Sequence, residues 1–111
     1  MIYYIRMNNQ LRQKISELPA VPGVYLFKNA NEEVIYVGKA VKLRSRVQSY
    51  FRENATLESA KRAMVKEIVD LQIYTCDSEI EALILESQLI KKYDTKYNIL
   101  MRDDKSYAYV A

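Results

Sequence analysis

The chain of 111 residues contains only two glycines, and each lies two positions from a tyrosine in a three-residue string. The first string is Gly23-Val24-Tyr25 and the second is Tyr36-Val37-Gly38. A polar triplet, Asn29-Ala30-Asn31, lies between them, so the pattern predicts two strands joined by a turn. Because glycine is so scarce, we expect both glycines to serve the backbone geometry or the close approach of a ligand.

The rest of the chain alternates between helix and strand signals. Strands are expected over about 24–27, 34–37 and 71–76, and helices over about 8–18, 41–51, 57–69 and 78–92. Gly38 is expected to end the second strand, and no structure is predicted for the polar segment 93–111. This order predicts an α/β (α+β) fold with a small, mostly antiparallel three-stranded sheet flanked by helices. We expect one domain over 1–111, with an N-terminal extension (1–10), a core (11–100) and a C-terminal tail (101–111).

Alternation of side chains along the hairpin places its two motif tyrosines on one face. Tyr25 and Phe27 point to one side of the first strand. On the second strand Val34, Tyr36 and Gly38 share a face. Tyr25 and Tyr36 are therefore expected on the same side, across from one another, where they could either pack or form a site.

Composition limits the chemistry that the chain can perform. It has no histidine, and Cys76 is its one cysteine, so a zinc site and an internal disulfide are not expected. Any metal would be a hard cation bound by oxygen. The single cysteine favours a reducing cytoplasm. No apolar run is long enough to span a membrane, and residues 1–6 do not read as a signal peptide.

A basic stripe follows the hairpin, and residues 39–52 contain no acidic side chain. The cations of this stripe are Lys39, Lys42, Arg44, Arg46 and Arg52. Such a stripe suits phosphate groups, although a solvated basic helix face would look the same. Arg46 and Tyr50 are four residues apart on a predicted helix, so they lie one above the other at the border of its apolar stripe. There the guanidinium could bind a phosphate through two nitrogens.

Glu86 is the most informative single residue. On a helical wheel it lies between apolar positions, with Leu83 and Ile90 on one side and Ala82 and Leu89 on the other. A buried carboxylate needs a cation or strong hydrogen-bond donors, and a divalent metal would meet that need. Most helical glutamates face water, so the placement of this one is what suggests a site.

These strings resemble the signature of the GIY-YIG nuclease superfamily. Their context resembles the N-terminal endonuclease domain of the bacterial excision nuclease subunit UvrC, from about residue 11 to the C-terminus. The resemblance is carried by residues 18–25, 35–51, 81–93, 97–99 and 103–107. The departures are the leading segment 1–6 and Ala108, where these proteins usually carry proline.

The resemblance implies a role for each residue of a site. The implied catalytic set is Tyr25, Tyr36, Lys39, Arg46, Tyr50, Glu86 and Asn98, with Glu86 as the ligand of one Mg²⁺ or Mn²⁺. DNA contacts are expected from Lys39, Lys42, Arg44, Arg46 and Arg52. A tyrosine, Tyr36 rather than Tyr25, is expected to deprotonate the attacking water. Its pKa would have to fall by about three units from about 10, with help from Lys39 and metal-bound waters.

The implied activity is a metal-dependent endodeoxyribonuclease. It would hydrolyse a phosphodiester bond on the 3′ side of a lesion in double-stranded DNA during nucleotide excision repair, with a UvrB–DNA complex as partner and no membrane. Three alternatives stay open: a stand-alone homing or restriction-type endonuclease, a non-catalytic nucleic-acid-binding module, and a docking domain. The first normally carries a sequence-reading module that is not evident in this chain. The second predicts metal-independent binding without cleavage.

Overall fold

A three-stranded antiparallel sheet forms the centre of the computed structural model, which describes residues 8–52 and 59–101. The strands are β1 (Gly23–Lys28), β2 (Val34–Ala40) and β3 (Asp70–Thr75). Their order in the sheet is β2-β1-β3, so β1 is central and both β2 and β3 are edge strands. The predicted fold class is confirmed. The predicted extension and tail lie largely outside the described residues, as do 103–107 and Ala108.

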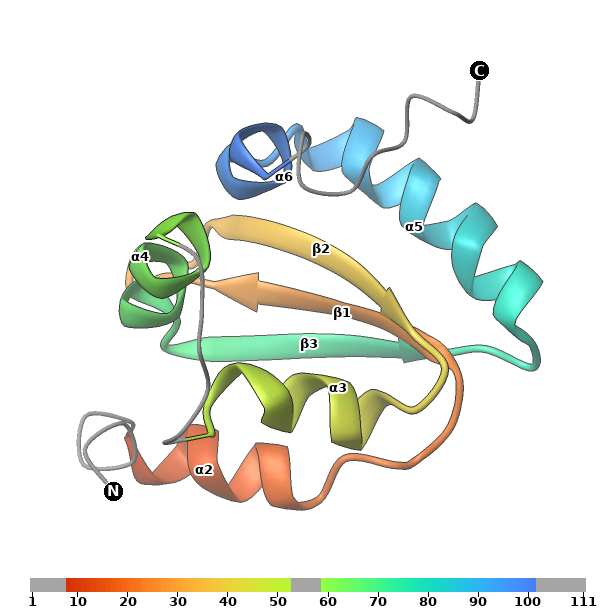
Figure 1. Cartoon of the computed structure of the whole chain (residues 1–111), viewed down its shortest axis with the longest axis horizontal. Coiled ribbons are helices and arrows are strands. Elements are labelled where there is room, and N and C mark those ends of the chain that lie inside the picture. Colours follow the sequence, from red (N-terminus) through yellow and green to blue (C-terminus); the bar gives the residue numbers. More distant parts are fainter. Residues whose placement is uncertain (1–7, 53–58, 102–111) are drawn as a thin grey trace.

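Five helices surround the sheet in the described part of the chain (Figure 1). They are α2 (Asn9–Ser16), α3 (Leu43–Tyr50), α4 (Ser59–Glu67), α5 (Glu79–Tyr93) and α6 (Lys96–Leu100). The helix α6 lies within 93–111, a segment for which no structure is predicted from the sequence. In Figure 1, α5 and α6 lie on the β2 side of the sheet, and α2 and α3 lie on the other side. None of the helices within 8–52 and 59–101 combines the length and apolar character needed to cross a membrane.

Side-chain caps fix the starts of two helices. The Asn8 side chain accepts a hydrogen bond from the Leu11 N–H at 2.7 Å, which makes Asn8 the cap of α2. At α5, Ser78 Oγ accepts from the Glu81 N–H at 3.2 Å, and Glu81 accepts from the Asp77 N–H at 2.8 Å. Ser78 is therefore the cap of α5, and the pair is a variant of the capping box in which Glu81 reaches the N–H of the residue before the cap.

Gly38 was predicted to end the second strand, and this prediction is wrong: β2 continues through Gly38 to Ala40. A Cβ atom at Gly38 would lie 2.4 Å from Tyr25 Oη, and one at Gly23 would lie 2.3 Å from the Tyr74 carbonyl oxygen. Neither glycine has a positive φ. Both glycines are therefore required because the protein's own atoms approach them closely.

Two apolar clusters cover the two faces of the sheet. The larger cluster joins one face to α2, α3, α4 and α6, and includes Tyr25, Phe27 and Tyr36. The smaller cluster joins Val24, Leu26 and Val37 on the other face to α5. Ile35 packs with the first cluster and Val34 with the second, which reverses the predicted alternation. The cause is a register shift at Phe27/Lys28, where Lys28 pairs with Val34 and Ile35 is left over.

The hairpin turn contains a strained residue, because Glu32 has a φ of 64°. This left-handed conformation costs a non-glycine residue about 1–2 kcal/mol. Glu32→Gly should therefore raise the free energy of unfolding by about 0.5–1 kcal/mol, after part of the gain is lost to the freer unfolded chain. Chemical denaturation measures the change. Ala30→Gly, in the same turn but without a positive φ, should lower stability instead. A loss of stability in both variants would contradict this explanation.

Candidate active site

Four aromatic side chains form a buried cluster beneath α3. Tyr25, Tyr36 and Tyr50 lie with their ring centroids 5.9–6.4 Å apart, and Phe27 packs against all three. Tyr25 Oη and Tyr50 Oη share a hydrogen bond of 2.8 Å. In the strand register Tyr25 is opposite Gly38, and Tyr36 is opposite Phe27. The two motif tyrosines therefore share a face as predicted but are diagonal neighbours, and the ring of Tyr25 occupies the space above Gly38.

Burial and mutual repulsion keep two of these phenols protonated. Burial, followed by the neighbouring Tyr50 and Tyr36, raises the pKa of Tyr25 well above its usual range. Burial and Tyr36 raise the pKa of Tyr50 to about 12. The guanidinium carbon of Arg46 lies 5.8 Å from the centre of the Tyr50 ring. Interaction with the Tyr25 phenol raises the pKa of Arg46, so its charge is fixed.

The raised pKa of Tyr50 predicts a loss of stability in alkali. The folded state holds the Tyr50 proton up to a pKa of about 12, whereas the unfolded state releases it near 10. The stabilisation is thus complete below pH 10 and is lost as the pH rises towards 12. This shift corresponds to a loss on the order of 3 kcal/mol. Urea denaturation at several pH values measures it, and Tyr50→Phe should show a shallower decline. An equally steep decline in that variant would contradict the assignment.

Glu86 is buried on α5, as its apolar neighbours predicted, and only 6% of its surface is exposed. It shares the buried stripe of the helix with Ala82 and Leu89, whereas Leu83 is half-exposed. Glu86 Oε2 accepts a hydrogen bond of 3.0 Å from the backbone N–H of Lys39 on β2. Within the described residues, no hydrogen-bond partner is found for Oε1. One oxygen is therefore held by the sheet, and nothing in 8–52 and 59–101 occupies the other, which could take a ligand.

The Asn98 side chain also binds the backbone of β2, at Val37, two residues before Lys39. Its Oδ1 accepts from the Val37 N–H at 2.8 Å, and its Nδ2 donates to the Val37 carbonyl at 2.9 Å. Because bonding alternates along an antiparallel ladder, Val37 and Lys39 direct their backbone groups away from β1. The side chains of Asn98 and Glu86 therefore cover the outer edge of β2.

The sheet separates the predicted site residues into two groups. Tyr25, Tyr36 and Tyr50 belong to the face packed against α3, and Glu86 lies on the side covered by α5. The Lys39 side chain leaves β2 on the face opposite to Tyr36. Lowering of the Tyr36 phenol pKa by Lys39 stays a prediction, and from this placement it would have to act across the edge of β2. The two groups can meet only around the edge of β2, which is where a substrate would have to bind.

Three of the five predicted DNA-contacting residues line one shallow groove of about 600 Å³. These are Lys39, Lys42 and Arg46, and serines 45 and 49 complete the polar wall. Arg44 does not line it: its Nε donates to the Leu18 carbonyl at 2.7 Å and ties α3 to the chain before β1. Arg52 is exposed just after α3 and lies outside the groove. The groove presents cations at the end of β2 where Glu86 is bound.

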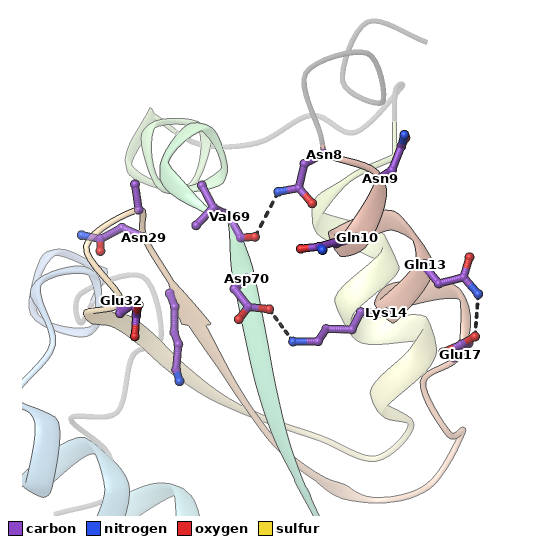
Figure 2. Close-up of a pocket in the computed structure, with 12 residues that line it drawn as sticks. Asn8, Asn9, Gln10, Gln13, Lys14, Glu17, Asn29, Glu32, Val69 and Asp70 are labelled. Atoms are coloured by element: carbon purple, nitrogen blue, oxygen red, sulfur yellow. Dashed lines mark hydrogen bonds and ion pairs between the residues drawn. The ribbon is translucent and has the colours of Figure 1, made fainter.

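Another cavity, of about 840 Å³, lies between α2, the hairpin turn and the start of β3 (Figure 2). Several of its side chains bond to one another or to the backbone. Asn8 donates to the Val69 carbonyl at 3.1 Å, and Lys14 forms an ion pair of 2.5 Å with Asp70. The residues that line it include none of the predicted site residues. This cavity therefore does not compete with the β2 edge as a site.

The carboxylate donor set at the β2 edge suits one kind of metal ion. Within 8–52 and 59–101 there is no group of three or more acidic or cysteine side chains that could hold a metal. A single buried carboxylate with one available oxygen fits a hard cation that keeps most of its water ligands, as Mg²⁺ does. The residues present therefore fit the predicted single-ligand site at Glu86.

Comparison with known proteins places this arrangement in a family. Residues 21–99 match the family of the UvrC-like GIY-YIG domain, and this stretch includes every predicted site residue. The chain belongs to the UvrC-like GIY-YIG family. Its sequence relatives include UvrABC system protein C of Caldicellulosiruptor saccharolyticus, which is 53% identical over 100 residues, and that of Clostridium tetani, 52% identical over 97 residues. These matches cover 90% and 87% of the chain but only 17% and 16% of the relatives.

A solved structure resembles most of this GIY-YIG domain. It is the N-terminal endonuclease domain of UvrC from Thermotoga maritima, bound to its catalytic cation magnesium. The two chains are 40% identical with a TM-score of 0.72, and the match covers 83% of this chain and 99% of that one. The same domain is known with its divalent cation in three tyrosine-to-phenylalanine variants and one asparagine-to-alanine variant.

Proposed function

We propose that this domain is a magnesium- or manganese-dependent endonuclease that hydrolyses DNA phosphodiester bonds. The observation that carries the proposal is Glu86, a buried carboxylate with one oxygen held by the Lys39 N–H and the other available. It lies at the edge strand that also leads into the groove lined by Lys39, Lys42 and Arg46. A metal ligand beside fixed cations is what phosphodiester hydrolysis requires.

Glu86 is proposed as the protein's ligand to the cation. In the Thermotoga maritima domain, each of the three tyrosine variants and the asparagine variant is bound to the catalytic cation. This supports a division of labour in which phenols and amides serve the phosphate or the water, and the carboxylate serves the metal. A bound Mg²⁺ would polarise the scissile phosphate and stabilise the departing 3′-side oxygen.

Arg46 is proposed to stabilise the charge that develops on the phosphate. It is exposed on α3, and the Tyr25 phenol beneath it raises its pKa, so it stays cationic throughout turnover. Tyr25 and Tyr50 hold each other through their hydroxyl groups and support the guanidinium from below. Their raised pKa values make them hydrogen-bond donors and poor bases at neutral pH. The role of Tyr25 is therefore to position Arg46 and Tyr50.

Tyr36 remains the proposed general base for the attacking water. It comes from β2 itself, the strand whose outer edge carries Glu86 and Asn98. Because the Tyr36 side chain is only 2% exposed, the proposal requires DNA binding to open a path from its hydroxyl to the attacking water on the tyrosine face, while the metal acts from the α5 face. A path around the strand edge would give the in-line arrangement of nucleophile and leaving group that the reaction needs.

The substrate is proposed to be double-stranded DNA with a lesion, cut on its 3′ side in nucleotide excision repair. The chain spans about a sixth of the length of the UvrABC system protein C relatives, so damage recognition and the UvrB–DNA partner are proposals taken from those relatives. A cytoplasmic location is proposed on the same basis.

Cleavage of supercoiled plasmid tests the proposed activity. The 111-residue chain should convert supercoiled to nicked circles with Mg²⁺ or Mn²⁺ and should do nothing with EDTA. Because the groove holds few cations, binding without metal should be weak and should fall as salt rises. Strong metal-independent binding without any nicking, on intact or damaged DNA, would favour the non-catalytic module instead.

A further inference from the structure

Thr95 is a buried polar residue outside the set of site residues predicted from the sequence. It precedes α6, and only 2% of its surface is exposed. A threonine at this position usually accepts a hydrogen bond from the backbone of the first turn. Here its side chain caps nothing, and its hydroxyl donates to Oδ1 of Asn98. The hydroxyl thus serves a side chain at the candidate active site.

The Asn98 side chain makes three hydrogen bonds to other described residues. An asparagine amide can accept two hydrogen bonds and donate two. Asn98 Oδ1 accepts from the Val37 N–H and from the Thr95 hydroxyl, and one N–H of Nδ2 goes to the Val37 carbonyl. Three of the four positions are occupied by the protein. The fourth, the second N–H, is left to donate to a ligand at the edge of β2.

We infer that Thr95 is a positioning residue that acts through Asn98, so that the remaining amide N–H is presented to a phosphate oxygen of the DNA. The inference rests on the proposed nuclease function. Val37 holds the amide from the strand, and Thr95 holds it from the start of its own helix. An amide held from two sides loses little conformational entropy when it binds the phosphate, and this lowers the activation free energy of cleavage.

Replacement of the hydroxyl by a methyl group tests the inference. In Thr95→Val, kcat should fall about tenfold, the lower end of what loss of a supporting hydrogen bond costs at a metal site, while KM for DNA changes little. Thr95→Ser keeps the hydroxyl and should restore kcat. In an Asn98→Ala background, Thr95→Val should have no further effect, because it acts only through Asn98.

Tyr97→Phe is the matched control on the same helix. It also removes a hydroxyl from α6, but that hydroxyl donates to Glu67 on α4 and is not near Asn98 in the bonding network. It should keep the wild-type kcat. If Tyr97→Phe slows the reaction as much as Thr95→Val does, the effect is general loosening of α6 and the inference is wrong.

The side-chain amide of Asn98 gives a readout that needs neither metal nor DNA. In the NMR spectrum of the metal-free protein, its two N–H resonances should shift and lose exchange protection in Thr95→Val but not in Thr95→Ser. Unchanged resonances together with an unchanged kcat would overturn the positioning role. If the wild-type protein does not cleave DNA, the proposed function fails, and the NMR comparison still decides whether Thr95 holds Asn98.

Discussion

Glu86→Gln is expected to abolish metal-dependent cleavage while the domain stays folded. Glutamine keeps the size of the side chain, and its carbonyl oxygen can still accept the Lys39 N–H, which now lies 3.0 Å from Oε2. It removes the negative charge that would hold the cation. Loss of the Lewis acid is worth several kcal/mol, so the rate should fall by about a thousandfold or more. Plasmid nicking measures the rate, and titration calorimetry with Mn²⁺ measures cation binding.

Glu79→Gln is the matched control for this prediction. It removes the same charge from the same helix, but Glu79 is exposed at the first turn of α5. It should cost at most a few tenths of a kcal/mol in stability through the helix dipole, and cleavage should be unaffected. Robust cleavage by Glu86→Gln, or equal loss in both variants, would remove Glu86 from the metal site.

Tyr36→Phe is expected to lower kcat by about 100-fold or more and to leave cation binding intact. General-base catalysis typically contributes factors of this size. The ring would keep its packing against Phe27 and Tyr25, so the fold should not change. Single-turnover nicking measures the chemical step, and Mn²⁺ titration measures the metal site.

The control for Tyr36 is an equally conservative change away from the site. Tyr74→Phe removes an exposed hydroxyl on β3 that bonds only to Gln72 in the described part of the chain. It should cleave like the wild type. A Tyr36→Phe variant with an unchanged rate would transfer the base to a water or to another group, while the metal proposal would stand.

Local patterns were sufficient to predict most of the fold. Period-two alternation gave the face shared by Tyr25 and Tyr36, and helical spacing gave the contact of Arg46 with Tyr50. The apolar neighbours of Glu86 gave its burial. These features depend on residues close in sequence, so short-range sequence patterns are enough to predict them.

Long-range features could not be predicted in the same way. The diagonal register of the tyrosines depends on which residue faces Gly38 across the hairpin, and that follows from the bulge at Ile35. The anchoring of Arg44 on the Leu18 carbonyl needs the packing of α3 on α2. The short helix α6 has too few residues for a periodic signal, yet it positions Asn98. Order of elements along the chain does not say that β2 is an edge strand.

The cover on the outer edge of β2 also bears on how the protein behaves at high concentration. An unprotected edge strand offers free N–H and C=O groups to the strands of other molecules and promotes aggregation. Asn98 occupies both groups of Val37, and Glu86 occupies the N–H of Lys39. Evolution at these two positions is therefore constrained twice, since a substitution that abolished cleavage by shortening either side chain would also expose an adhesive strand. Loss-of-function variants here should be recovered as self-associating protein more often than variants in the basic groove.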